Sequence, residues 1–211
     1  MNMRLDDLDV LDLNEDDDLE VKSEEGKDEQ SADETFEWKK EVKSFIFTLL
    51  ITVALVFVLK NYIIINATVP TGSMENTIMP DDNILGNRLA YLSEGPKRGD
   101  VIFFYFPDDE SQKFVKRVIG LPGETVTILE GKIYIGNSNE PLDEPYLKEE
   151  WTRGVGPYVF QIPEDSYLCL GDNRNNSKDA RDWNNPYVKK EKIIGKAIFT
   201  YFPIDRWGVV E

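Results

Sequence analysis

The chain divides into three regions by the pattern of its apolar and polar residues. Residues 1–43 are dominated by acidic side chains. Such a segment cannot bury enough apolar surface to offset the entropy lost on ordering, so it is predicted to be a disordered, acidic tail. Residues 44–65 are apolar on all sides. Residues 66–211 alternate short β-branched and aromatic runs with turns that contain Gly and Pro, which predicts a mainly β domain.

The segment 44–65 is long enough to cross a membrane, and Lys60 near one end is its only charged residue. As an α-helix it would span about 33 Å, roughly one bilayer core. It has no polar face, which argues against a helix buried in a soluble protein. It also lacks the terminal small-x-small site of a cleavable signal peptide. We therefore expect one transmembrane helix.

The basic residues that flank this segment predict its orientation. Lys39, Lys40 and Lys43 precede it, whereas only Lys60 lies at its far end. The positive-inside rule then places the N-terminus in the cytoplasm and residues 66–211 on the extracytoplasmic side.

Six runs in the third region have the residue types of strands: residues 84–89, 101–106, 114–119, 125–129, 132–135 and 193–202. Glu130 and Gly131 separate two of these runs and are typical of a tight hairpin. Short runs joined by such turns favour antiparallel sheets or a partly open barrel. We expect this architecture for the domain, with a small β region inserted at about residues 124–165.

Composition narrows the function. Of the net charge of −16, the tail holds −11, and the rest of the chain has no basic stripe that could neutralise phosphates, so nucleic-acid binding is not expected. Cys169 is the only cysteine and lies in an apolar run, so it is predicted to be a buried thiol without an intrachain disulfide. The chain has no histidine, and together these facts exclude a zinc site of the usual kind.

The absence of histidine also restricts nucleophilic catalysis. A serine needs a base at neutral pH, and a Ser-His-Asp triad cannot be built here. A lysine desolvated until its neutral form is accessible is the remaining choice. Ser73 lies in a Pro- and Gly-containing turn, where backbone amides and the Thr71 hydroxyl could stabilise an oxyanion. Taken alone, however, a serine in such a turn is more often simply a turn residue.

Lys116 is the candidate base. Period-two alternation places it on one strand face between Phe114 and Val118. If that face is inward, desolvation lowers the lysine pKa; the alternative is a solvent-facing lysine on an edge strand. Residues 171–183, dense in hydrogen-bonding groups, follow an apolar strand. They predict either a loop that orients the amine and is locked by an Asp–Arg pair, or an ordinary polar surface loop.

Together these patterns resemble the type I signal peptidases of bacteria, membrane-bound serine proteases. The resemblance covers residues 44 to about 203, and its motifs occur in the family's order. They are Pro70-Thr71-Gly72-Ser73-Met74, Arg98-Gly99-Asp100-Val101-Ile102, Lys116-Arg117-Val118-Ile119-Gly120-Leu121-Pro122-Gly123, Gly171-Asp172-Asn173-Arg174, and then Ser177, Asp179 and Arg181. The length and the single cysteine resemble the compact form found in Gram-positive bacteria.

The resemblance implies a role for each matching residue. Ser73 would be the nucleophile and Lys116 its general base, with Met74 packed beneath the nucleophile. The Ser73 N–H and the Thr71 hydroxyl would form the oxyanion hole; many relatives have serine at the position of Thr71.

In the later motif, Ser177 would orient the Lys116 amine, and Asp179 and Arg181 would hold the loop as an ion pair. No metal or cofactor is implied.

The resemblance also implies partners: pre-proteins that carry signal peptides with small residues at −1 and −3, the lipid bilayer, and proximity to the secretion translocon. Trp183, Phe202 and Trp207 are candidates by residue type for contact with lipid, and the alternative for each is ordinary packing in the core. Two alternatives are a self-cleaving Ser-Lys peptidase of the repressor type and a membrane-tethered binding module without catalysis.

Overall fold

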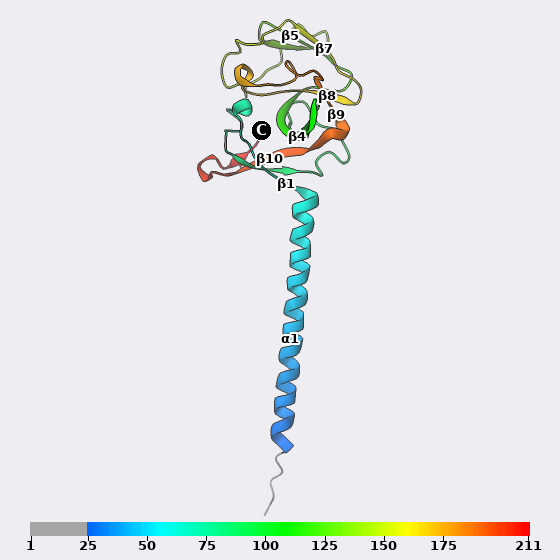
Figure 1. Ribbon diagram of the computed structural model, residues 1–211, viewed down its shortest axis with the longest axis vertical. Helices are drawn as coiled ribbons and strands as arrows, with labels where there is room; N and C mark the ends of the chain where they lie inside the picture. The colour runs from blue at the N-terminus through cyan, green and yellow to red at the C-terminus, as the bar shows by residue number, and fades with distance from the viewer. Residues whose placement is uncertain (1–24) are drawn as a thin grey trace, which may run out of the picture. The chain divides into compact units, whose positions relative to one another are not determined.

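The computed structural model describes residues 25–211 (Figure 1). The chain forms two compact units that divide between Thr52 and Val53. Residues 1–24 of the predicted disordered tail lie outside the described residues.

The N-terminal helix α1 (Glu25–Val58) continues as a π-helical turn η1 (Leu59–Ile63). It begins at Glu25, before the predicted start at residue 44. Extending an existing helix through residues rich in Glu and Lys adds one hydrogen bond per residue and meets little resistance from propensity. It ends earlier than predicted, because Ile64 and Ile65 pair with a strand of the β domain.

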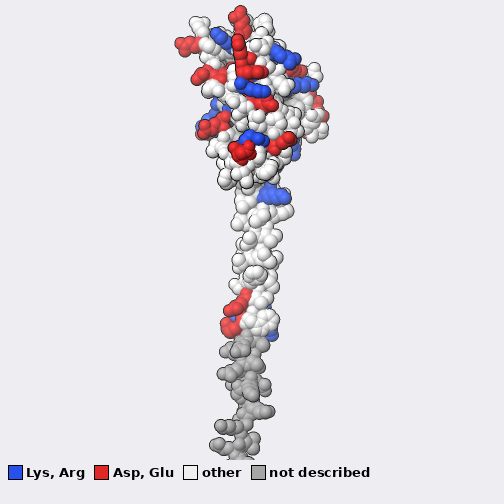
Figure 2. Space-filling model, turned by 90° about the vertical axis from the view of Figure 1, so that its left-hand side faces the viewer, with Lys and Arg blue, Asp and Glu red and all other residues white. Residues whose placement is uncertain are grey.

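Within the described residues, one stretch is long and apolar enough to cross a membrane. It covers Glu37–Ile63 and has a mean hydropathy of 2.5, and none of its most apolar stretch is buried against the rest of the protein. Figure 2 shows a length of helix surface that carries no Lys, Arg, Asp or Glu on the face in view. Length and composition therefore agree with the single span that the sequence predicts.

The β domain contains a large antiparallel sheet and a small one. The large sheet follows the order β1 (Ile64–Thr68), β2 (Asn83–Asn87), β10 (Ile193–Phe202), β3 (Val101–Phe106), β4 (Asp109–Gly120), β8 (Ser166–Leu170) and β9 (Tyr187–Lys189), with β11 (Gly208–Val209) beside β10. The small sheet has the order β6 (Lys132–Ile135), β5 (Thr125–Leu129) and β7 (Tyr158–Gln161). The mainly antiparallel β fold after one apolar helix is thus confirmed.

The strand predictions from β-branched and aromatic runs hold. Strands β3, β5, β6 and β10 have the predicted bounds, and β2 and β4 overlap theirs. The hairpin between β5 and β6 is confirmed, since Glu130 and Gly131 both have positive φ (50° and 72°), as a two-residue hairpin turn requires. Strands β1, β7, β9 and β11 were not predicted, because they are short and their patterns are weak.

Two hydrophobic clusters fill the domain. Figure 1 shows the small sheet beside one face of the large sheet. One cluster contains residues of both sheets, among them Phe104, Val118, Ile128, Phe160 and Leu168. The other includes Ile65 of β1, Met74, Ile84 of β2, Phe103 of β3 and Val115 of β4. Because β1 and β4 are separated by three strands in the sheet order, their meeting in one cluster means that the large sheet is strongly curled.

Candidate active site

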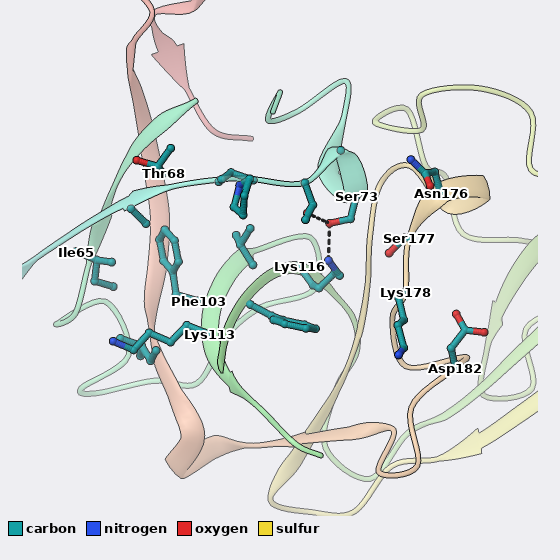
Figure 3. A pocket seen from close by; sticks show the side chains of 18 of the residues that line it. Ile65, Thr68, Ser73, Phe103, Lys113, Lys116, Asn176, Ser177, Lys178 and Asp182 are labelled. Atoms are coloured by element: carbon teal, nitrogen blue, oxygen red, sulfur yellow. Dashed lines mark hydrogen bonds between the residues drawn. The ribbon is translucent and has the colours of Figure 1, made fainter. Parts of the chain in front are cut away.

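Ser73 and Lys116 meet inside the domain although 42 residues separate them in sequence. The Lys116 Nζ donates a hydrogen bond of 2.5 Å to Ser73 Oγ, and the two residues are only 4% and 7% exposed. Thr71 Oγ1 lies 3.4 Å from the same Ser73 oxygen (Figure 3). The three side chains that the sequence proposed for the reaction centre therefore converge on one point.

The turn that carries Ser73 is held from below and from the side. Ser73 lies in a short 3-10 helix, η2 (Gly72–Met74), and the Met74 side chain is fully buried. The backbone N–H of Asn173 donates to the Ser73 carbonyl at 3.1 Å, and its side-chain amide donates to the Gly72 carbonyl at 2.9 Å. These contacts join the turn to the loop that follows β8.

The amine of Lys116 lies in apolar surroundings. Its Nζ is 5.6 Å from the centre of the Phe114 ring, and Ile102 stands opposite it on β3. Burial lowers the pKa of Lys116 from its usual value to about 8, against the raising effect of the Asp179 and Asp172 charges. The strand face that carries Lys116 therefore points inward, as the first of the two alternatives predicts. With a pKa of about 8, about a tenth of the Lys116 amines are neutral at pH 7.

The Asp179–Arg181 pair locks the loop after β8. The Arg181 guanidinium donates to both oxygens of Asp179, at 2.8 and 2.9 Å. It also donates to the Arg174 carbonyl at 2.9 Å. Asp179 in turn accepts the Gly171 N–H at 3.0 Å. The loop is therefore fixed at its start and its end by a charge-assisted, bidentate pair.

Ser177 does not make the hydrogen bond that the family resemblance implies. Its Oγ is buried and has no hydrogen-bond partner among the described residues, so the hydrogen bond to Lys116 is not formed in this structure. The side chain nevertheless lines the cleft that contains Ser73 and Lys116 (Figure 3).

Arg117 and Asp172 form a second buried ion pair that the sequence reasoning missed. Arg117 is 2% exposed and Asp172 is fully buried. Nε and Nη2 of Arg117 donate to the two carboxylate oxygens at 2.9 and 2.7 Å, and Thr77 Oγ1 donates to Asp172 at 2.5 Å. Both faces of β4 are buried here, so a charge next to Lys116 must have a partner. The sequence signal for this ion pair was Arg117 itself, a charged residue inside an apolar strand.

Residues 142–153, between β6 and β7, pack against the loop after β8 and form a strap over it. Glu144 accepts a hydrogen bond of 2.5 Å from Arg174, and the Trp151 ring lies under the guanidinium groups of Arg174 and Arg181. Asn175 Oδ1 accepts from the backbone N–H of Arg153 at 3.0 Å. Nothing in the sequence pattern of this segment marked it as support for the site.

A cleft of about 710 Å³ opens at Ser73 and Lys116. One wall is formed by residues 65–73, from β1 to the nucleophile turn, and another by residues 113–116 of β4. Residues 175–178 close a further side (Figure 3). β1 is at the end of the sheet order and pairs only with β2, so the cleft adjoins an unpaired strand edge.

The three aromatic residues suggested for lipid contact differ in exposure. Trp183 is buried and packs against the rings of Phe104, Phe106 and Phe114, so that suggestion is wrong for Trp183. Phe202 and Trp207 are more than half exposed.

Comparison with known proteins identifies the family. The sequence model of "Signal peptidase, peptidase S26" matches residues 42–202, more than half of the chain. This chain belongs to the signal peptidase family. It is 35% identical to signal peptidase I of Leptolyngbya laminosa over 77% of this chain and 81% of that protein. It is 29% identical to signal peptidase IB of Staphylococcus aureus, over 80% and 94% of the two chains.

A solved structure is also similar: the signal peptidase I of Enterococcus faecalis V583 is 32% identical, and the match covers 49% of this chain and 97% of that one, with a TM-score of 0.41. Family membership confirms the resemblance found in the sequence and the expected activity, that of a serine peptidase that removes signal peptides. With the apolar span Glu37–Ile63, the signal peptidase has the features of a single-pass membrane protein.

The buried amine gives a first prediction. Lys116 has a pKa of about 8 when folded and its ordinary 10.5 when unfolded, so below pH 8 the buried charge destabilises the fold by about 3 kcal/mol. Lys116→Met should raise the free energy of unfolding by about that amount at pH 7. The gain should shrink as the pH rises from 8 to 10.5, because the folded wild-type amine then loses its charge. Denaturant unfolding of the detergent-solubilised wild type and variant, at pH 7 and again near pH 10.5, measures this difference in the free energy of unfolding.

Lys132→Met is the matched control for this prediction, since Lys132 is exposed and its removal should change the free energy of unfolding little. Equal or lower stability of Lys116→Met at pH 7 would mean that the amine is not desolvated.

Gly171 gives a second prediction. A Cβ at this position would overlap Ser177 Oγ and lie 2.5 Å from the Ser73 carbonyl oxygen. Gly171→Ala should therefore displace both residues and lower the rate of signal-peptide cleavage about tenfold or more, because small misplacements of reacting groups are costly. Gly208→Ala is the control, since a Cβ there meets no atom within 4 Å. Cleavage at the wild-type rate by Gly171→Ala would contradict this tight packing.

Proposed function

We propose that Ser73 and Lys116 of this signal peptidase are its nucleophile and general base. The observation that carries the assignment is the contact of 2.5 Å between Lys116 Nζ and Ser73 Oγ inside a buried, largely apolar site. A buried lysine whose pKa has fallen to about 8 can accept the serine proton at neutral pH, which a lysine in water rarely does.

The first half of the reaction is acylation. Neutral Lys116 accepts the proton of the Ser73 hydroxyl as Oγ attacks the carbonyl carbon of the scissile peptide bond. The negative charge that develops on the carbonyl oxygen is stabilised by the Ser73 N–H and the Thr71 hydroxyl. Two features support these donors: Ser73 is in the first turn of η2, where N–H groups lack a partner within the helix, and Thr71 Oγ1 is 3.4 Å from the nucleophile.

Collapse of the tetrahedral intermediate breaks the C–N bond. Protonated Lys116 gives its proton to the leaving amine, which becomes the new N-terminus of the mature protein. Water then attacks the acyl-enzyme while Lys116 accepts one of its protons. As the acyl C–Oγ bond breaks, Lys116 returns this proton to Ser73 Oγ, and the signal peptide leaves with a free carboxyl group. The same amine acts in both halves, and the proton balance closes without another titrating group.

The loop after β8 orients the base. Ser177 lines the cleft beside Lys116, and its buried hydroxyl has no other partner among the described residues. It is therefore available to hold the amine when substrate is bound. Asp179 and Arg181 keep this loop in place through their bidentate pair. Met74 supports the nucleophile from below through its full burial.

The substrate binds as an extended strand in the cleft. Residues 65–70 of the unpaired β1 edge and its continuation line the cleft, so main-chain hydrogen bonds along this edge can hold a peptide of varied sequence. Small residues at −1 and −3 would let the peptide approach the buried Ser73 closely. Pre-proteins with a signal peptide meet both requirements.

The membrane delivers this substrate. The apolar span ends at Ile63, and the ten residues from there to Ser73 extend at most about 35 Å. The site thus stays near the bilayer surface, where a signal peptide that spans the membrane presents its cleavage site. Lys39, Lys40 and Lys43 favour a cytoplasmic N-terminus and an extracytoplasmic β domain. A position beside the secretion translocon follows from the same substrate.

Lipid contact by the β domain has its own support. Four exposed apolar side chains lie close together in sequence near the end of the chain: Phe202 of β10, Ile204 of η5 (Ile204–Arg206), Trp207, and Val209 of β11. Aromatic residues of this kind favour the membrane–water interface.

Cleavage of a model pre-protein tests the assignment. Ser73→Ala and Lys116→Ala should each abolish processing of a substrate with an Ala-x-Ala site, because one removes the nucleophile and the other the base. Both variants should retain the circular dichroism spectrum of the wild type. Sequencing of the product's N-terminus checks the cleavage position. Normal processing by Lys116→Ala would refute the assignment of the base.

The pH dependence of kcat/KM tests the same base independently. Because only neutral Lys116 accepts a proton, activity should increase with pH, about tenfold per unit well below pH 8, and level off above it. The measurement uses single-turnover cleavage between pH 6 and 9.5, with unfolding checked at each pH. A flat profile, or a rise centred near 10.5, would contradict a desolvated lysine base.

A further inference from the structure

The cleft at Ser73 carries an excess of positive charge besides Lys116. Arg88, Lys113, Arg153 and Lys178 all line it, and Asp182 is the only acidic residue in its lining. Among the described residues, none of these four cations has a carboxylate within ion-pair distance, whereas other lysines of the domain do, such as Lys192 with Glu110 and Lys196 with Asp100. Lys178 interacts only at longer range with Asp108. A cleft that gathers cations without a carboxylate at ion-pair distance is suited to an acidic ligand.

The backbone at three of these cations is fixed. Lys113 is paired with Tyr105 in the sheet, and its Nζ is 5.8 Å from the centre of that ring. The backbone N–H of Arg153 donates to Asn175 Oδ1 at 3.0 Å, and its guanidinium donates to the Asn175 carbonyl at 3.3 Å.

Lys178 lies between two buried residues, Ser177 and Asp179, in the loop that the Asp179–Arg181 pair locks. The positive charges therefore start from defined positions on the cleft wall.

The cations lie on both sides of the reaction centre. In Figure 3, Lys113 and Lys178 are on opposite sides of Ser73 and Lys116. A peptide extended through the cleft with its scissile bond at Ser73 would pass one of them before the bond and the other after it. Since successive side chains of an extended peptide are about 3.3 Å apart along the strand, several of its positions come within range of each charge.

We propose that this positive cleft selects pre-proteins with acidic side chains on either side of the cleavage site, and that Lys113 and Lys178 are specificity-determining residues. An Asp or Glu of the substrate would place a carboxylate at ion-pair distance from these lysines, which no described residue does. Such charge complementarity raises the association rate and discriminates against basic segments. This inference rests on the proposed function, because it assumes that the peptide bond cleaved lies at Ser73.

The alternative occupant of these cations is the phosphate of lipid headgroups, since the protein is anchored in a membrane. Cleft residues that bind lipid would not distinguish between substrates that differ by one charge near the cleavage site. A substrate scan in detergent without anionic lipid therefore separates the two.

The experiment uses the full-length protein in neutral detergent and one pre-protein with an Ala-x-Ala site. Single positions from −5 to +5, with −3 and −1 left unchanged, are replaced in turn by Asp, Asn and Lys, and kcat/KM is measured for each. We expect Asp to exceed Asn about threefold to tenfold at some positions on each side, and Lys to be the poorest. The preference should shrink in 0.5 M NaCl, because salt screens exposed charges.

Variants of the enzyme show which lysine acts on which side of the cleavage site. Lys178→Glu should reverse the Asp preference on one side of the cleavage site, and Lys113→Glu should reverse it on the other. Lys132→Glu, an equal change of charge at an exposed position of β6 outside the cleft, should keep the wild-type ratios. Because the readout is a ratio within each enzyme, a general loss of activity does not mimic it.

Equal cleavage of Asp and Asn substrates by the wild type, or unchanged ratios in both lysine variants, would overturn the proposal while leaving the peptidase assignment intact. Failure to cleave even the Asn substrates would instead refute the proposed function.

Discussion

The site depends on keeping one amine dry beside one hydroxyl. Lys116 is almost fully buried, and burial lowers its pKa although two carboxylates nearby raise it. Each of those carboxylates has its own arginine: Asp172 pairs with Arg117 and Asp179 with Arg181, both through two hydrogen bonds. A paired carboxylate exerts a weaker field than a free one. The two ion pairs therefore fix the loops around Lys116 without restoring the charge that the proposed base has to lose.

The strap of residues 142–153 shows how far this requirement extends. It contacts the arginines of the site rather than Lys116: Glu144 binds Arg174, the Tyr146 ring lies 4.0 Å from the Arg117 guanidinium, and Trp151 packs under Arg174 and Arg181. Stacking on aromatic rings excludes water from guanidinium groups that already have their hydrogen bonds. The segment between two strands of the small sheet thus stabilises the loops that enclose the amine, and it also brings Arg153 to the cleft.

Much of this arrangement could be predicted from the sequence, but not the contacts between distant segments. The bounds of β3 and β10 follow from β-branched and aromatic runs, and the absence of histidine directs attention to Lys116. By contrast, the sequence assigns the first two residues of β1 to the end of the membrane helix, since Ile64 and Ile65 suit either element until β2 supplies hydrogen bonds. The partner of Arg117 could not be predicted either, because Asp172 lies 55 residues away and only the fold brings the two together.

The proposed lysine base would explain why this domain encloses Ser73 and Lys116 so fully. A histidine titrates near neutral pH without help, so it can serve in a partly exposed site. A lysine must be moved by several pKa units, and only desolvation does this without placing another cation beside the nucleophile. The curled sheet, the locked loop and the strap all contribute to that desolvation. The same enclosure leaves an open side, the cleft along β1. In the proposed binding mode the substrate completes the exclusion of water there, and a closely fitting extended peptide with small side chains would do this best.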